Sequence, residues 1–301
     1  MKKHSLTVYA PAKINLTLDI IGTNSDGFHE IATIFQAVSL FDIVTVTVSD
    51  SSGITISCDY PNIPLNENNI VYKAAELFFR ETKINPLGLH IDIQKNIPAQ
   101  AGLAGGSTDG AAVLTALNQL LLYPLSNTDL LRIGAKIGAD VPFCIDGGTQ
   151  LAKGIGTELT KLKDFPGCFI VICKPDISVS TAEAYRKSDL MIKKSFLYTE
   201  NALKFLSEGQ LQSFFKYMKN DFEDALCLEE ISSIKSVMTQ NKAQGSCLSG
   251  SGSAVFGIFS DEPTALYCAD ILKAEYRDVF LCKPVQKGVH AAPDARTIPF
   301  A

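Results

Sequence analysis

The chain has 301 residues, of which 46% are hydrophobic and 20% are charged, and its formal net charge is −5 at pH 7. This length allows two lobes around substantial cores. The acidic balance excludes a general attraction to nucleic acid or to anionic membranes, and no apolar run reaches the length that spans a bilayer.

The cysteines and the first residues indicate the cellular compartment in which the protein is expected. Eight cysteines are scattered without C-x-x-C spacing, mostly in apolar or mixed runs. Such spacing is typical of reduced thiols that pack as small hydrophobic groups, and it argues against a zinc site or a disulfide framework. The basic start at residues 1–3 is followed by polar residues that interrupt any signal-peptide core. We expect a cytoplasmic protein, a monomer or weak homodimer, with no nucleic-acid or membrane partner.

The first predicted strand covers residues 13–20, where apolar and polar side chains alternate. This alternation places Lys13 and Asn15 side by side on the polar face of the strand. A turn at residues 24–27 then leads into a second, mostly apolar strand that runs to about Leu40.

Further alternating segments before residue 97 predict an antiparallel sheet with one covered face; they are residues 44–48, 54–58 and 87–93. Helices are predicted over residues 69–81, 109–122 and 126–137. The second of these helices is apolar nearly all round, so we expect it to be central. The pattern differs from the buried parallel strands of a doubly wound fold.

The second half of the chain alternates predicted helices with short strands. The helices are residues 182–188, 199–206, 211–218, 229–240 and 263–276, and the strands are 168–173, 254–259 and a short one after the last helix. The end, residues 283–301, is expected to be loosely ordered. These elements predict an α+β protein with two lobes, residues 1–160 and 161–301, mixed or antiparallel sheets covered by helices, and a cleft between the lobes.

A glycine-rich loop between Ile97 and Gly110 joins a predicted strand to the central helix. Glycine lets backbone N–H groups approach an anion closely, and a helix N-terminus adds unpaired donors. Ser107 and Thr108 suit the helix N-cap. The loop lacks the lysine of a Walker loop, the spacing G-x-G-x-x-G and the pattern of a serine-hydrolase elbow. It predicts a phosphate site, although a turn needed only for close packing explains the same residues.

Three segments taken in order resemble the motifs of the GHMP small-molecule kinases; they are residues 11–16, 98–108 and 248–252. The resemblance extends over about residues 8–282. Within the family, the chain is most similar to members that recognise a cytidine diphosphate substrate of the non-mevalonate isoprenoid pathway, through residues 10–16, 26–30, 138–143 and 220–223. The resemblance implies a two-lobed GHMP kinase fold in which ATP phosphorylates the 2-hydroxyl of the substrate's methylerythritol part.

The resemblance implies catalytic roles for two residues. Asp140 is expected to act as general base on the attacking hydroxyl, or at least to orient it. Lys13 is expected to stabilise negative charge on that oxygen and on the transferring phosphoryl group. From the residues alone, Asp140 is also explained as a turn carboxylate that satisfies backbone N–H groups, and Lys13 as a solvated strand lysine.

The implied ATP site lies on the glycine loop, with Asn69 and Lys95 near the purine. The loop residues are Pro98, Ala99, Gln100, Ala101, Gly102, Leu103, Ala104, Gly105, Gly106, Ser107 and Thr108. Mg²⁺ is expected to accompany ATP, bound mainly through phosphates and water, and Ser107 or Thr108 is expected to reach it.

The implied substrate site begins at Phe28 and His29, which resemble the family's cytosine clamp. There a ring stacks on the base, and imidazole and backbone groups hydrogen-bond its edge. The other implied substrate-binding residues are Asn15, Thr181, Tyr185, Gly250 and Gly252. A purely structural turn before a core strand also explains the two glycines.

Several positions depart from the family pattern. Phe28 stands where tyrosine is usual, Ala104 replaces a glycine, Thr108 replaces a serine, and the basic residue often found before Asp26 is missing. Alanine at position 104 is acceptable if the backbone angles there are ordinary. Two alternative functions are another GHMP kinase, such as homoserine or mevalonate kinase, and a nucleotide-binding regulator that has lost phosphoryl transfer.

Overall fold

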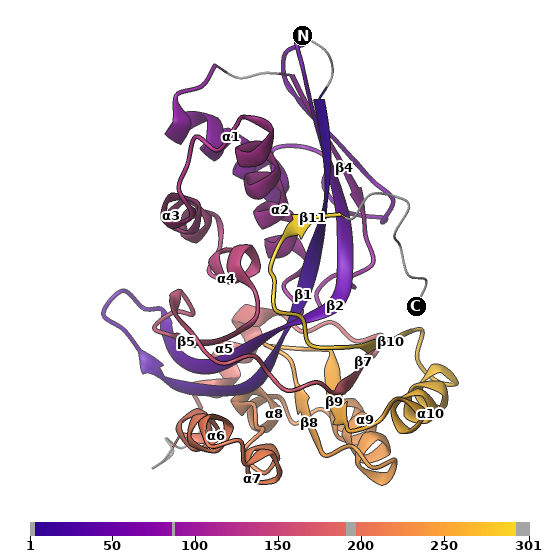
Figure 1. Cartoon of the computed structure of the whole chain (residues 1–301). Helices are drawn as coiled ribbons and strands as arrows, with labels where there is room; N and C mark the ends of the chain where they lie inside the picture. The colour runs from indigo at the N-terminus through magenta and orange to yellow at the C-terminus, as the bar shows by residue number, and fades with distance from the viewer. Residues whose placement is uncertain (1–3, 86–87, 191–196, 293–301) are drawn as a thin grey trace.

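The computed structural model describes residues 4–85, 88–190 and 197–292, which form two sheets with helices packed against them (Figure 1). The strands of the first sheet are β1 (His4–Thr23), β2 (His29–Ser49), β3 (Ile54–Cys58), β4 (Gly88–Gln94), β5 (Thr149–Lys153), β6 (Glu158–Lys161) and β11 (His290–Ala291). Those of the second are β7 (Phe169–Lys174), β8 (Gly245–Leu248), β9 (Val255–Phe259) and β10 (Asp278–Cys282), in the order β10-β7-β9-β8.

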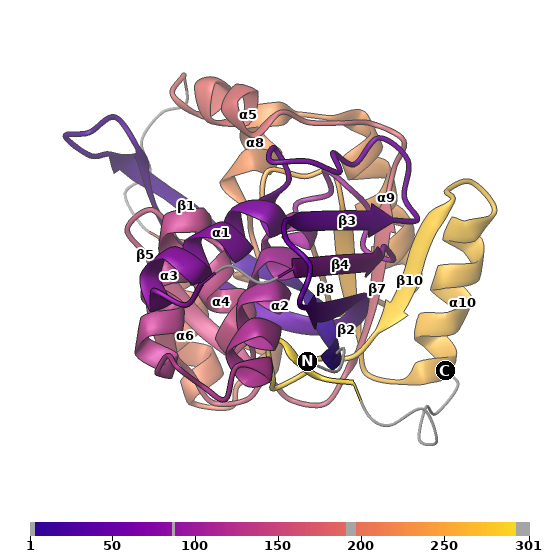
Figure 2. The ribbon, with the colours of Figure 1, turned by 90° about the horizontal axis from the view of Figure 1, so that it is seen from above.

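The helices divide between the two sheets. The first sheet carries α1 (Ile70–Thr82), α2 (Gly105–Leu120), α3 (Asn127–Ile137) and α4 (Val141–Asp146) on one face, as both views show (Figures 1 and 2). The second half of the chain contains α5 (Thr181–Ser188), α6 (Tyr198–Ser207), α7 (Leu211–Phe215), α8 (Asp221–Leu226), α9 (Glu229–Gln240) and α10 (Glu262–Lys273). The expected central helix is α2, most of whose residues are buried. The prediction of an α+β architecture is therefore confirmed.

The strand β1 carries the segment in which polar and apolar residues alternate, and its polar face is buried as well. Asp19 accepts hydrogen bonds from the backbone N–H groups of Tyr198 and Thr199 at 2.9 and 2.7 Å. The Thr17 hydroxyl lies 2.9 Å from that of Thr199. The polar face of this stretch is thus covered rather than solvated, because α6 packs against it.

The first sheet is mixed rather than antiparallel. Strand β3 pairs with β4 in parallel, with Ile54 opposite Leu89. The chain between them forms α1, and a helical crossover is the usual way to bring two strands into parallel register. Most other pairings are antiparallel, including the long one between β1 and β2. Leu87, the first residue of one predicted strand, lies outside the described residues.

The C-terminal stretch was expected to be loosely ordered, and for residues 283–292 this is wrong. Val285 N–H donates to the carbonyl oxygen of Ala37 at 2.9 Å, and β11 pairs with β1. The side chain of Val289 is buried against the first core. Residues 293–301 lie outside the described part. Within the described ranges, no helix is both long and apolar enough to cross a bilayer.

Candidate functional site

A cavity of about 1290 Å³ lies where the two halves of the chain meet. Lys13 of β1, the glycine loop and Asp140 line it from the side of the first sheet. Tyr185 of α5 and the turn at residues 250–252 line it from the other side. The three segments that resembled family motifs therefore share one cavity, as the sequence predicts.

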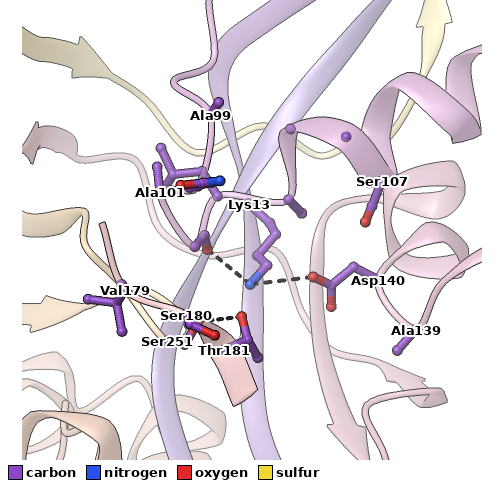
Figure 3. A pocket seen from close by; sticks show the side chains of 18 of the residues that line it. Lys13, Ala99, Ala101, Ser107, Ala139, Asp140, Val179, Ser180, Thr181 and Ser251 are labelled. Carbon is purple, nitrogen blue, oxygen red and sulfur yellow. Dashed lines mark hydrogen bonds and ion pairs between the residues drawn. The ribbon is translucent and has the colours of Figure 1, made fainter. Parts of the chain in front are cut away.

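Lys13 is held by oxygen atoms and is not solvated. Its side chain is only 5% exposed. The ammonium donates to Asn15 Oδ1 at 2.8 Å and to the carbonyl oxygen of Gly102 at 3.1 Å, and it lies 5.0 Å from the centre of the Phe35 ring. It also lies 3.7 Å from Asp140 Oδ2, and Figure 3 shows the two side chains pointing toward each other. The explanation of Lys13 as a solvated strand lysine is thus wrong.

Asp140 occupies the N-cap position of α4, yet in the described structure its side chain makes no capping hydrogen bond. The carboxylate is 31% exposed, and the residue lines the cavity. Its distance of 3.7 Å to the Lys13 ammonium is longer than a charge-assisted hydrogen bond. The carboxylate is therefore available to a ligand, and the turn-carboxylate explanation finds no support.

The glycine loop ends in a helix that begins earlier than predicted. The first helical hydrogen bond of α2 runs from Thr108 N–H to the carbonyl oxygen of Ala104 at 2.9 Å. Ala104, which has no side chain that could cap, is the N-cap, so the prediction of Ser107 or Thr108 at that position is wrong. The amides of Gly105, Gly106 and Ser107 precede this bond, and unpaired donors at a helix N-terminus favour an anion.

One glycine of the loop is required by close contact with the third motif. Gly102 has a φ of +74°, and a Cβ there would lie 2.0 Å from the carbonyl oxygen of Ser249. The Ser249 hydroxyl donates to the carbonyl oxygen of Gly102 at 2.9 Å. The loop and the turn at residues 250–252 are thus packed backbone against backbone.

Ala104 has a φ of +59° and a ψ of +26°, in the left-handed region. The condition under which alanine is acceptable here, ordinary backbone angles, is therefore not met. A left-handed conformation costs an L-residue roughly 1–2 kcal/mol, whereas glycine adds about 0.5–1 kcal/mol of unfolded-state entropy. We expect Ala104→Gly to stabilise the fold by about 0.5–1 kcal/mol, measured by urea unfolding.

Ala99 provides the matched control for that substitution, because it belongs to the same loop and is not among the residues with positive φ. We expect Ala99→Gly to destabilise the fold by about 0.5–1 kcal/mol. A loss of stability in both variants would contradict the account of Ala104.

Lys95 and Asn69, the residues implied for the purine, line the cavity but are engaged in the protein. The Lys95 ammonium pairs with Asp42 and, at 2.8 Å, with Asp109, and its side chain is 4% exposed. Burial lowers the pKa of Lys95, but the two carboxylates outweigh this and raise it. Burial also raises the pKa of Asp109 well above its ordinary value. Asn69 caps α1 through Val71 N–H. Contact of either residue with a purine remains a prediction.

The residues implied for base recognition also line the cavity. The His29 ring stacks on Tyr185, with centroids 4.3 Å apart, and its Nε2 lies 2.7 Å from Asp189 Oδ1. Burial, together with the charge of Asp140, raises the pKa of Tyr185 to about 12, so its phenol stays neutral. Phe28 is 61% exposed, which leaves its ring free to cover a base.

Asn15 was expected to bind substrate, but its amide is committed within the protein. The residue is 1% exposed. Its Oδ1 accepts from Lys13 Nζ and from Gly250 N–H, both at 2.8 Å, and its Nδ2 donates to the Thr33 hydroxyl at 2.9 Å. The structure therefore favours Asn15 as a holder of the Lys13 ammonium.

Comparison with known proteins agrees with this geometry. The family models for the GHMP kinases N terminal domain and GHMP kinases C terminal match residues 69–148 and 202–278. A 4-diphosphocytidyl-2-C-methyl-D-erythritol kinase from Caldicellulosiruptor saccharolyticus is 42% identical, and the alignment covers 90% of this chain and 94% of that protein. The chain belongs to the GHMP kinase family.

Solved structures agree with the GHMP kinase fold. A crystal structure of 4-(cytidine 5'-diphospho)-2C-methyl-D-erythritol kinase matches with a TM-score of 0.79 and 30% identity, covering 93% of this chain and 99% of that one. Homoserine kinase from Cytophaga hutchinsonii also matches with a TM-score of 0.79, at 21% identity, covering 97% and 98%. The second match supports the fold alone. The predictions of family, two-lobed fold and kinase activity are thus confirmed.

The side-chain hydroxyl of Ser107 or of Thr108 was expected to bind Mg²⁺ in this GHMP kinase. Ser107 lines the cavity, and Figure 3 shows it on the same side of the site as Asp140. Thr108 is fully buried and does not line the cavity, so the structure favours Ser107 of the two. Among the described residues, no group of three or more His, Cys, Asp or Glu side chains could hold a metal ion. The Ser107 hydroxyl and the Asp140 carboxylate that line the cavity are oxygen donors, which suit Mg²⁺ held chiefly by phosphates.

Sequence reasoning missed several residues that shape the kinase site. Asp42 anchors Lys95, Asp189 contacts His29, and Asn220 binds the turn at residues 250–252. The sequence did indicate a role for Asp42. It is a lone carboxylate in the apolar run Leu40-Phe41-Asp42-Ile43, and a buried charge needs a partner. Asp189 had no such local signal, whereas Asn220 lies in the segment 220–223 that carries the family resemblance but was given no role.

Proposed function

We propose that this kinase transfers the γ-phosphoryl group of ATP to the 2-hydroxyl of 4-diphosphocytidyl-2-C-methyl-D-erythritol, a step of the non-mevalonate isoprenoid pathway. The observation that carries the proposal is the convergence of the Lys13 ammonium, the Asp140 carboxylate and the glycine-loop amides on one cavity. The names of the relatives support the substrate. The position of His29 and Tyr185 in the same cavity supports recognition of its base.

In the proposed reaction, Asp140 takes the proton of the 2-hydroxyl as the oxygen forms its bond to the γ-phosphorus. The bond between that phosphorus and the β,γ-bridging oxygen breaks, and ADP leaves with the bonding electron pair. Lys13 offers positive charge to the attacking oxygen and the transferring group. Its orientation is set beforehand by Asn15 and Gly102, so little reorganisation is needed in the transition state.

The phosphates are proposed to lie on the amides at the start of α2, where the helix dipole favours negative charge. Bound Mg²⁺ would neutralise part of the phosphate charge, and the Ser107 hydroxyl, which lines the cavity, would be an oxygen ligand for it. Asn69 and Lys95 are proposed to border the purine, Lys95 through its aliphatic part because its ammonium is paired. Other loop residues contribute backbone and shape.

Base recognition is proposed for Phe28, His29, Thr181 and Tyr185. Phe28 lacks the tyrosine hydroxyl usual in the family, so its contribution is stacking alone. The Thr181 hydroxyl lies 2.9 Å from that of Ser251, which joins α5 to the turn that contains Gly250 and Gly252. These glycines are proposed to shape the substrate side of the cavity.

Turnover with a panel of alcohols tests this function. We expect the cytidine diphosphate substrate to be phosphorylated with a kcat/KM at least about 100-fold above that for homoserine or mevalonate, because a site that binds polar groups strongly rejects substrates without them. ADP release and the phosphorylated product are both measured. A preference for homoserine or mevalonate would identify another GHMP kinase, and nucleotide binding without turnover would indicate a regulator.

We also propose the cellular compartment and the oligomeric state. All eight cysteines are free thiols, which is typical of a reducing compartment such as the cytoplasm. Burial raises the pKa of several of them, Cys282 to about 12. Because one chain supplies every residue of the proposed site, a monomer or weak homodimer would suffice.

A further inference from the structure

The segment Asn220–Glu223 at the start of α8 takes no part in the chemistry above, although each of its polar side chains binds another part of the chain. Asp221 Oδ2 accepts from Ile20 N–H at 2.7 Å, and Glu223 Oε1 accepts from Leu248 N–H at 2.8 Å. Asn220 is completely buried. A buried polar group whose role is unexplained is a candidate for positioning the site.

The side-chain amide of Asn220 both donates and accepts hydrogen bonds. Its Nδ2 donates to the carbonyl oxygens of Leu248 and Gly250, both at 2.8 Å. Its Oδ1 accepts from Phe222 N–H at 3.0 Å and so caps α8. Only the second contact serves the helix. The two donated bonds fix the backbone at each side of Ser249.

Gly250 connects this amide to the catalytic lysine. Its carbonyl is held by Asn220, and its N–H donates to Asn15 Oδ1 at 2.8 Å. That same oxygen accepts from Lys13 Nζ at 2.8 Å. The position of the Gly250 peptide therefore influences the position of the atom that orients the ammonium.

Asn220 is also anchored to the strand that carries Lys13. Leu18 of β1 forms a bridge with Asn220, and Leu18 N–H donates to the carbonyl oxygen of Lys219 at 2.8 Å. One residue thus ties the turn to β1 from the opposite half of the chain. This anchoring holds Asn220 in a fixed position relative to β1, and Asn220 in turn holds the turn at residues 250–252.

We propose that Asn220 is a positioning residue for the phosphoryl transfer: it holds the Gly250 turn, through which Asn15 keeps the Lys13 ammonium directed at the reacting oxygens. The inference rests on the proposed function of Lys13. It explains why an amide is needed here, since two carbonyl oxygens require two donated hydrogens while the helix cap requires an acceptor.

Asn220→Asp tests the proposal, because aspartate keeps the helix cap and the shape but turns an acceptor toward both carbonyls. We expect kcat to fall by about 10- to 100-fold with the KM for ATP changed by less than about threefold, the pattern of a misplaced group in the transition state. Hydrogen exchange of the Gly250 amide is expected to accelerate. Asn220→Ser, which can cap and donate once, should give an intermediate kcat, and it carries the test if the aspartate variant does not fold.

Asn118→Asp is the matched control for the effect of a buried asparagine on stability. Asn118 is 4% exposed, lies in α2, and binds both the N–H and the carbonyl of Leu125, away from the cavity. It should lower stability while leaving kcat unchanged. If both Asn220 variants keep kcat within about threefold of wild type, or lose no more than Asn118→Asp, the positioning role is overturned. If the wild-type chain does not phosphorylate the cytidine substrate, the proposed function is overturned instead. In that case, an unchanged rate of hydrogen exchange at the Gly250 amide in Asn220→Asp would still decide against the positioning role.

Discussion

Asp140→Asn is expected to lower kcat by about 10²- to 10⁴-fold, the contribution typical of a positioned general base. Asparagine has nearly the same shape and cannot take the proton of the attacking hydroxyl. Folding should be preserved, because the Asp140 side chain makes no capping bond in the described structure and is 31% exposed. The measurements are steady-state kcat, ATP affinity and the urea unfolding midpoint.

A control for this result lies on the same helix. Asp146 is exposed at the end of α4, where it accepts from Asn127 Nδ2 at 3.0 Å, and it does not line the cavity. Asp146→Asn should therefore retain kcat. Nearly normal turnover by Asp140→Asn, with ATP binding unchanged, would remove the carboxylate from the chemistry and leave the Lys13 ammonium and the loop amides as the catalytic groups.

Lys95→Met is expected to reduce the free energy of unfolding by about 3–5 kcal/mol, the cost typical of leaving a buried charge without its partner. The Lys95 ammonium pairs with two carboxylates whose side chains are at most 5% exposed. Asp42 also accepts from the backbone N–H groups of Asn96 and Ile97, at 2.7 and 2.8 Å, so it cannot turn away to solvent without losing them. Denaturant unfolding measures the loss.

Lys136 offers a matched exposed lysine. It pairs with Glu81 at 2.7 Å with its side chain 47% exposed, and such pairs contribute about 0–1 kcal/mol. Lys136→Met should therefore change stability little. Adding Asp109→Asn to Lys95→Met removes one uncompensated carboxyl group and should recover part of the stability. A loss from Lys95→Met no larger than that from Lys136→Met would show that the buried cluster is not structural.

Local patterns predicted the regular elements well. The helix expected at residues 229–240 coincides with α9, and Ser126, the first residue of the helix expected at 126–137, is the N-cap of α3 and accepts from Asp129 N–H. Short elements such as α4 and α8 were not predicted, because six residues contain too little periodicity to distinguish a helix from a turn. The parallel pairing of β3 with β4 was not predicted for a different reason. Alternation of side chains within a strand does not indicate the direction of the neighbouring strand.

By itself, the sequence determined the family, the glycine loop and the two groups proposed for the chemistry, because these depend on residue types in short runs. Only the tertiary structure decided that Asn15 holds Lys13, that Lys95 is paired and that Ala104 adopts a left-handed backbone. These features arise from contacts such as that between Asn15 and Gly250, which are 235 positions apart. Periodicity reports only the environment within a few residues, whereas a buried polar group finds its partner wherever the fold brings one within hydrogen-bond distance.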